Sequence, residues 1–87
     1  MNLKKAVLIF KAMANLKRLE ILIYLRHHEL SVGDLQTKLK ISQSALSQHL
    51  AVLRRAQMVQ TRRSKQQIFY RLDNPIAKQM LNFFKKE

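Results

Sequence analysis

Residues 42–59 have the sequence SQSALSQHLAVLRRAQMV, and most of the architecture can be worked out from them. A serine opens the segment, and serine is a preferred cap for the first N–H groups of a helix. Leu46, Leu50 and Leu53 then recur at i, i+4 and i+7, the spacing that lines one buried face of a helix. The segment therefore predicts a helix that begins after Ser42 and packs on a core through its leucines.

The opposite face of this helix is polar and nearly uncharged over its first half. Its short hydroxyl and amide side chains are Gln43, Ser44, Ser47 and Gln48, and Arg54 and Arg55 follow toward the C-terminal end. A face exposed only to solvent more often carries Glu and Lys. Hydroxyls and amides, by contrast, reach base edges in a DNA major groove roughly 12 Å wide. We interpret the four polar residues as base-reading side chains rather than a merely solvated surface.

A second helix is predicted directly upstream. Ser31 is a candidate N-cap, and Leu35 and Leu39 point inward at helical spacing. Only Lys40 and Ile41 separate this helix from the next cap, so the connection is a tight turn. Two helices joined in this way predict a helix-turn-helix, with the cation Lys38 close enough to contact a phosphate.

The pattern changes to period two after the second helix of this pair. Val59 and Thr61 alternate on one predicted strand, and residues 68–72 alternate on the next. The segment RRSKQQ, residues 62–67, lies between them. Its cations are Arg62, Arg63 and Lys65. We predict a two-stranded basic wing that contacts phosphates or the minor groove. The fold class is mainly α with a small β-hairpin, a winged helix-turn-helix of about five helices.

Both ends of the chain predict helices that are too apolar for a single buried face. Residues 3–13 carry apolar side chains on more than one face, and so does the helix that Asn74 and Pro75 open. A monomer of this size would leave these side chains as exposed patches, which is uncommon in soluble monomers. We therefore predict a homodimer whose interface includes Val7, Phe10, Met80, Phe83 and Phe84.

A further helix is predicted after Asn15, a candidate N-cap. Its apolar residues fall at helical spacing and are predicted to be buried: Leu16, Leu19, Leu22 and Ile23. The helix ends near His27 and His28, which we interpret as a solvated helix end rather than a metal site, since adjacent side chains on a helix diverge. For His49 a hydrogen-bonded structural role and a phosphate contact are both open.

The composition favours a polyanionic partner. Seventeen Lys and Arg stand against five acids, for a formal net charge of +12 over 87 residues. Such a positive field suits nucleic acid. An anionic membrane surface is the alternative, but the cations form no dominant amphipathic cluster and no apolar run approaches the roughly 20 residues needed to span a bilayer.

The chain has no Cys, one Gly and one Pro, so no thiolate site, disulfide or obvious linker is available. We predict a single domain over residues 1–87. The five-residue apolar run after the first lysines is too short for a signal peptide, and we predict a cytoplasmic, nucleoid-associated protein. Scattered acids and the lack of a nucleophile motif or Gly-rich loop argue against an enzyme.

Three segments together resemble the ArsR/SmtB family of winged-helix repressors: ELSVGDL at residues 29–35, the segment at 42–59 and IFYRL at residues 68–72. The resemblance covers nearly the whole chain and is nearest to the HlyU-like, sulfur-responsive branch. It implies a dimer joined by its first and last helices that binds imperfect inverted repeats in promoters. It also implies base contacts from the four polar residues of the recognition helix.

The sensing residues of the family are absent. Ser31 and Gly33 stand where the resemblance would place two thiolate ligands, and soft metals lose their site. Pro75 and Lys86 stand where a second metal pattern would need ligands, and Ile23 stands at a redox cysteine position. We therefore expect no metal and no cofactor, and the sequence identifies no small-molecule effector.

Two other hypotheses stay open. In one, the basic face binds RNA or an acidic protein partner and the winged fold is a scaffold. In the other, the protein is a regulator that reads DNA but has lost sensing, and it acts constitutively, by competition, or through an organic ligand held between subunits.

Overall fold

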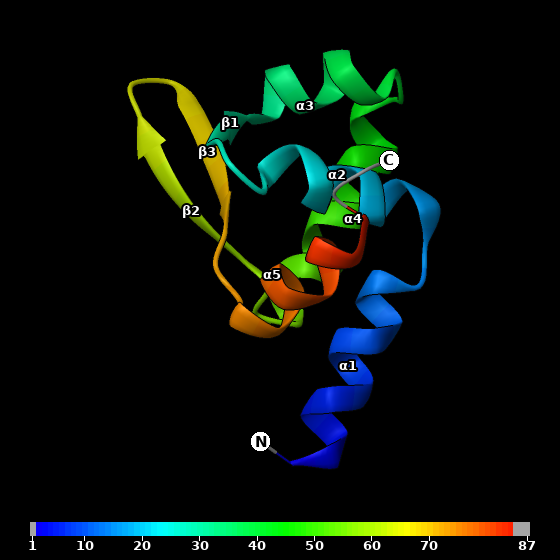
Figure 1. The fold of residues 1–87 in the computed structure, drawn as a ribbon. Coiled ribbons are helices and arrows are strands. Elements are labelled where there is room, and N and C mark those ends of the chain that lie inside the picture. The colour runs from blue at the N-terminus through cyan, green and yellow to red at the C-terminus, as the bar shows by residue number, and fades with distance from the viewer. Residues whose placement is uncertain (1, 85–87) are drawn as a thin grey trace.

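The computed structural model describes residues 2–84 (Figure 1). Its helices and strands, in chain order, are α1 (Leu3–Met13), α2 (Leu16–Leu25), β1 (Leu30–Ser31), α3 (Val32–Leu39), α4 (Gln43–Arg55), β2 (Val59–Ser64), β3 (Gln67–Leu72), α5 (Pro75–Leu81) and the 3-10 turn η1 (Asn82–Phe84). Lys86, which bears on the absent metal pattern, lies outside the described residues.

The predicted helix caps are confirmed. The side chains of Asn15, Ser31, Ser42 and Asn74 each accept a hydrogen bond from a backbone N–H in the first turn of α2, α3, α4 and α5, at 3.0 to 3.1 Å. Each cap satisfies a donor that the helix leaves without an intrahelical partner. Local chemistry therefore sets where these four helices begin.

The core forms where the helices meet the base of the sheet. The predicted leucines of α3 and α4 are all buried, as are Met58, Tyr70 and Leu72. In α2 the prediction was wrong for two side chains, since Leu16 is 72 % exposed and Ile23 is 40 % exposed. The buried face of α2 instead carries Ile21, Leu22 and Leu25, with Leu19 packed at its edge. Leu16 and Ile23, seven residues apart, lie together on another face.

The wing contains one strand more than predicted. The sheet has the order β1-β3-β2, and the two-residue β1 pairs with β3 through Leu30 with Tyr70 and Ser31 with Phe69. The strands β2 and β3 are also longer than predicted, because they take up Arg62, Arg63 and Ser64 on one side and Gln67 on the other. The loop at the wing tip is therefore two residues long.

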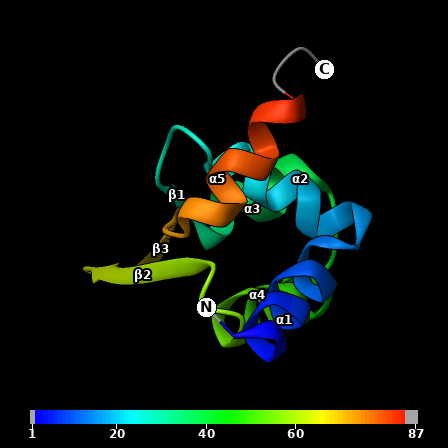
Figure 2. The same cartoon turned by 60° about the horizontal axis from the view of Figure 1, so that its bottom comes forward.

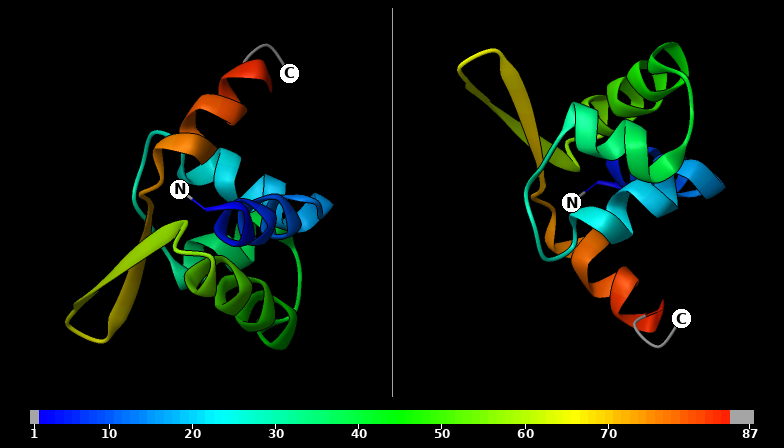
Figure 3. Two further views of the ribbon diagram at one scale, coloured as in Figure 1. Left: turned by 90° about the horizontal axis from the view of Figure 1, so that it is seen from below. Right: turned by 90° about the horizontal axis from the view of Figure 1, so that it is seen from above.

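The arrangement places α4 and the wing on one side of the molecule. Seen from below and from above, α4 and the tip of the wing lie on the same side, and α5 lies on the opposite side (Figure 3). Helix α1 lies beside the C-terminal end of α4 (Figure 2). The predicted DNA-contacting elements thus share one side, and the two terminal helices lie elsewhere.

Candidate nucleic-acid interface

The polar side chains of α4 form one exposed face. Gln43, Ser44, Ser47 and Gln48 are all exposed, and Leu46, Leu50 and Leu53 on the opposite side are buried. Ser42 caps the helix at the end where this face begins. Serine side chains are short, so an approaching groove could come close to the helix backbone while the two amides reach base edges. The structure therefore brings the four predicted base-reading residues together.

A groove joins this helix to the wing. It has a volume of about 310 Å³, and its lining includes Gln43 from α4, Gln66 and Gln67 from the wing tip, and Ser31 and Gly33 from the start of α3. The amide of Gln43 and the wing tip therefore lie on the two sides of one opening. The second helix of the pair and the wing therefore lie side by side, as in a winged helix-turn-helix.

The cations predicted on α3 and α4 are Lys38, Arg54 and Arg55. All three are exposed, but their side chains make different contacts within the protein. The ammonium of Lys38 lies 5.5 Å from the centre of the Tyr24 ring, a cation–π distance. The Nη1 of Arg54 donates a hydrogen bond to the hydroxyl of Tyr70 in β3 and so joins α4 to the base of the wing. Within residues 2–84 the side chain of Arg55 makes no hydrogen bond or ion pair and is available to a phosphate.

In the wing, Arg62 is already bound within the protein. Its Nη2 lies 2.7 Å from Oε1 of Glu29, and its Nε donates to Oε1 and Oε2 of the same carboxylate at 2.8 and 2.9 Å. The hydrogen bond to Glu29 raises the pKa of the Arg62 guanidinium above its ordinary value. By contrast, Arg63 and Lys65 are exposed and have no ion pair among the described residues. A phosphate contact by Arg62 therefore stays a prediction.

In this structure His49 has the first of the two roles that the sequence left open, a hydrogen-bonded structural role. It flanks the buried face of α4, and its Nδ1 lies 3.4 Å from Nη1 of Arg18. The same guanidinium donates to the carbonyl oxygens of Ala12 and Lys11 at the end of α1, at 2.6 and 3.1 Å. Burial lowers the pKa of His49 below its ordinary value of 6.5, and the positive charges of Arg18 and Lys17 lower it further.

The structural contacts of Arg18 and Glu29 were not predicted from the sequence. Arg18 connects the end of α1, the start of α2 and the recognition helix, and Glu29 holds the wing. The one signal for Glu29 was its rarity, because it is one of five acids in a chain with seventeen cations. No comparable signal marked Arg18.

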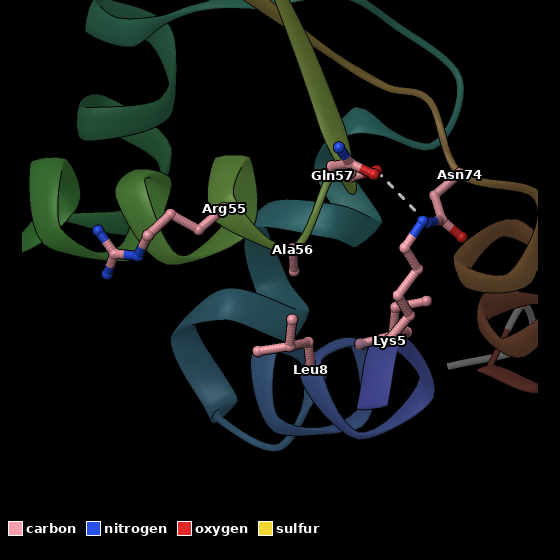
Figure 4. Close-up of a pocket in the computed structure, with 7 residues that line it drawn as sticks. Lys5, Leu8, Arg55, Ala56, Gln57 and Asn74 are labelled. Atoms are coloured by element: carbon pink, nitrogen blue, oxygen red, sulfur yellow. Dashed lines mark hydrogen bonds between the residues drawn. The ribbon is translucent and has the colours of Figure 1, made fainter. Parts of the chain in front are cut away.

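A pocket of about 380 Å³ lies where α1 meets the end of α4 (Figure 4). Lys5, Leu8 and Ile9 line it from α1, and Arg55 and Asn74 line it from the other side. On that side Asn74 donates to the carbonyl of Gln57 at 3.3 Å, and the side chain of Arg55 points away from the pocket (Figure 4). Among the described residues, no group of three His, Asp or Glu side chains could hold a metal ion.

The predicted interface residues are exposed on the terminal helices. Phe83 is 83 % exposed, Phe10 54 % and Phe84 41 %, and Val7 and Met80 are exposed as well. On α1, Leu3, Val7 and Leu8 line a shallow apolar hollow with Lys4. Aromatic side chains exposed to this extent leave an apolar surface uncovered in the single chain.

The fold and the site define a class of protein. Two helices joined by a tight turn, followed by a hairpin that lies beside the second helix, form a winged helix-turn-helix. None of the described helices has the length and apolar character needed to cross a membrane.

Comparison with known proteins identifies the family. The model of the arsR family of bacterial regulatory proteins matches residues 15–61. The transcriptional activator HlyU of Vibrio cholerae is 54 % identical over 80 residues, which cover 92 % of this chain and 74 % of that protein. A biofilm growth-associated repressor of Agrobacterium fabrum is 43 % identical over 77 residues, covering 88 % of this chain and 66 % of the repressor. The chain belongs to the arsR family of bacterial regulatory proteins.

Solved structures support the same assignment. The structure of HlyU from Vibrio cholerae superposes with a TM-score of 0.90 at 51 % identity and covers 95 % of this chain and 90 % of that one. A homodimeric winged helix-turn-helix DNA-binding domain from Mycobacterium bovis superposes with a TM-score of 0.86 at 25 % identity, covering 97 % and 78 %. The predicted family and fold class are confirmed, apart from the additional strand β1.

Proposed function

We propose that the protein is a transcription regulator that binds an inverted-repeat DNA operator as a homodimer in the bacterial cytoplasm. The observation that carries the proposal is the exposed polar face of α4, uncharged at Gln43, Ser44, Ser47 and Gln48, beside the cations of the wing. This combination suits base reading by the helix and phosphate binding around it.

The proposed phosphate contacts surround the base-reading face. Arg55, Arg63 and Lys65 have side chains free for phosphate oxygens, and Lys38 and Arg54 keep further N–H donors beyond their contacts with Tyr24 and Tyr70. A lysine or arginine in such a position adds affinity without sequence preference. Arg62 is bound to Glu29 and is not among the proposed phosphate contacts.

The exposed apolar residues of α1 and of the C-terminal segment support the dimer. A second copy would cover Val7, Phe10, Met80, Phe83 and Phe84 and remove their apolar area from water. Two-fold symmetry would then present two copies of α4 to successive major grooves, with half-sites about 10 to 11 base pairs apart or a multiple of that spacing.

Selection of bound sequences from a random pool of duplexes, with purified protein near physiological salt, tests the proposal. We expect the selected sequences to share an inverted repeat with half-sites spaced by one helical turn or a multiple. Unenriched sequences would mean binding by charge alone, and would favour the hypothesis of an RNA-binding or acidic-partner-binding protein.

Matched variants separate the two kinds of contact. Gln43→Ala or Ser47→Ala is expected to weaken the preferred operator by about 1–3 kcal/mol and leave binding to unrelated duplexes unchanged. Arg63→Ala with Lys65→Ala is expected to weaken all duplexes alike. Loss of sequence preference in the wing variant and not in the helix variants would reverse the roles.

The salt dependence of binding is a separate prediction. With about 6 to 10 phosphates neutralised per dimer, the log–log slope of affinity against salt should lie between about −5 and −9.

A further inference from the structure

The wing is attached to the body of the protein at its base only. Val59, Tyr70 and Leu72 are buried and anchor the lower part of β2 and β3. Above them, β1 supports β3 only as far as Ser31 opposite Phe69. Along the remainder of β2 and β3 no side chain is fully buried, so the outer half of the hairpin has no core of its own. We call the level of Phe69, where support from the body of the protein ends, the hinge of the wing.

A single side chain spans the sheet at this hinge. Arg62 in β2 is the cross-strand partner of Phe69 in β3, and its guanidinium carbon lies 4.7 Å from the centre of the Phe69 ring. Cross-strand partners lie on the same face of a sheet, so the guanidinium crosses β3 above this ring. It then reaches Glu29, the residue just before β1, in the three contacts of 2.7 to 2.9 Å described above.

We propose that Glu29 and Arg62 act as a strap that sets the angle of the wing relative to α4, so that Arg62 is a positioning residue of the DNA interface. The inference rests on the proposed function. The Nε–Nη2 edge of the guanidinium is occupied by Glu29, so only the N–H groups of Nη1 and the outer N–H of Nη2 remain for another partner. The carboxylate is neutralised by the same contact, so an acid can lie beside the proposed DNA surface.

Because the strap lies several residues below the wing tip, a small rotation at its level would displace the tip by several ångströms. Lys65 lies three residues beyond Arg62, about 10 Å along the strand at the usual rise per residue. A rotation of about 20° at the hinge would therefore move the tip by roughly 3 to 4 Å, more than the length of a hydrogen bond. Arg63 and Lys65 would lose their phosphates even though neither residue had been altered.

The experiment compares two substitutions at Arg62 with one at Glu29, using the selected operator. If Arg62 works through Glu29 and Phe69, Arg62→Lys should weaken binding as much as Arg62→Ala, since lysine has neither the planar fork nor the stacking surface. Glu29→Gln should also weaken binding, although it removes a negative charge. We expect losses of about three- to tenfold per dimer for all three variants.

The salt dependence separates positioning from direct contact. Arg63→Ala, the matched control, should reduce the magnitude of the salt slope by about 1 to 2 per dimer. Arg62→Lys keeps the charge at residue 62, but under the strap it should reduce the slope at least as much as Arg63→Ala, because Arg63 and Lys65 lose their phosphates together with the wing. Wild-type affinity for Arg62→Lys, or tighter binding by Glu29→Gln, would overturn the strap and identify Arg62 as a phosphate ligand.

Hydrogen exchange in the absence of DNA tests the strap even if the proposed function fails. Backbone amides of residues 62–69 should exchange faster in Glu29→Gln than in the unaltered protein, whereas those of α4 should not change. Arg63→Lys should match the unaltered protein throughout. Unchanged exchange in Glu29→Gln would overturn the strap, whereas a protein without sequence preference would overturn only the proposed function.

Discussion

The recognition helix and the wing lie on the same side of the molecule but are held in opposite ways. Helix α4 places Leu46, Leu50 and Leu53 in the core, each at most 2 % exposed, along nearly its whole length. The wing buries side chains only at its base, and its outer half depends on hydrogen bonds between strands and on the contact of Arg62 with Glu29. In the proposed function, sequence reading is thus assigned to the element anchored in the core, and phosphate binding in part to the element that is anchored only at its base.

The largest effect should come from comparing a leucine of α4 with an apolar residue of the wing. Leu50→Ala should lower the free energy of unfolding by about 2–5 kcal/mol, because it opens a cavity in the core. Ile68→Ala, at an exposed position of β3, should cost less than about 1 kcal/mol. Denaturant unfolding measures both. Equal costs would contradict the proposed difference in anchoring.

The start of α4 offers a smaller test of how firmly the helix is held. Ser42→Ala removes the hydroxyl that accepts from the N–H of Ala45 at 3.1 Å, and should cost about 1 kcal/mol of stability. Ser44→Ala changes the same chemistry two residues later, where no cap is lost. Denaturant unfolding of this control should show little change, so similar losses in both variants would argue against a specific cap.

The turns before α4, before β2 and at the wing tip share a backbone feature. Lys40 ends α3 at a φ of 56°, and Gln57 in the turn before β2 and Lys65 in the wing loop both have a φ of 58°. Because glycine adopts this region without steric cost, Lys40→Gly should raise the free energy of unfolding by about 0.5–1 kcal/mol. Lys38→Gly, inside α3, should lower it by about 1 kcal/mol. Destabilisation by both would show that Lys40 is not strained.

His49 provides the smallest expected effect, and it concerns the link between α4 and α1. Its pKa is lower in the folded protein than the ordinary value of 6.5, so as the pH falls the unfolded chain takes up the proton first. The contribution of neutral His49 to stability is complete above about pH 6.5 and is lost as the pH falls through the folded-state pKa. Unfolding measured from about pH 7.5 to about pH 5.5 should be less pH-dependent in His49→Gln.

Local chemistry explains which parts of the fold could be predicted from sequence. Helix caps and the i, i+4, i+7 leucines act within about two turns of a helix, and both led to the correct helices around Ser42. Strand β1 could not be predicted, since Leu30 and Ser31 become a strand only by pairing with Tyr70 and Phe69 some forty residues away. The left-handed turn at Lys40 was also hidden, because lysine carries no signal for that conformation.

The candidate site shows the same division. The polar face of α4 followed from helical periodicity alone, and the structure brings all four of its residues together. The partner of Arg62 could not be predicted in this way, because Glu29 is 33 residues away. Nothing in the sequence shows which of seventeen cations an acid will pair with. Charge placement could therefore be predicted for the wing, whereas charge pairing needed the three-dimensional fold.

The strand order has a consequence for the behaviour of the protein at high concentration. Because β3 is central, β2 is an outer strand, and one row of its backbone N–H and C=O groups has no neighbouring strand. Such an edge is a template for strand addition and aggregation. Arg62 and Arg63 lie side by side on it, so a second copy of β2 would bring like charges together. We therefore expect the cations of the wing, Arg63 above all because Arg62 is paired with Glu29, also to disfavour edge-to-edge self-association of the sheet.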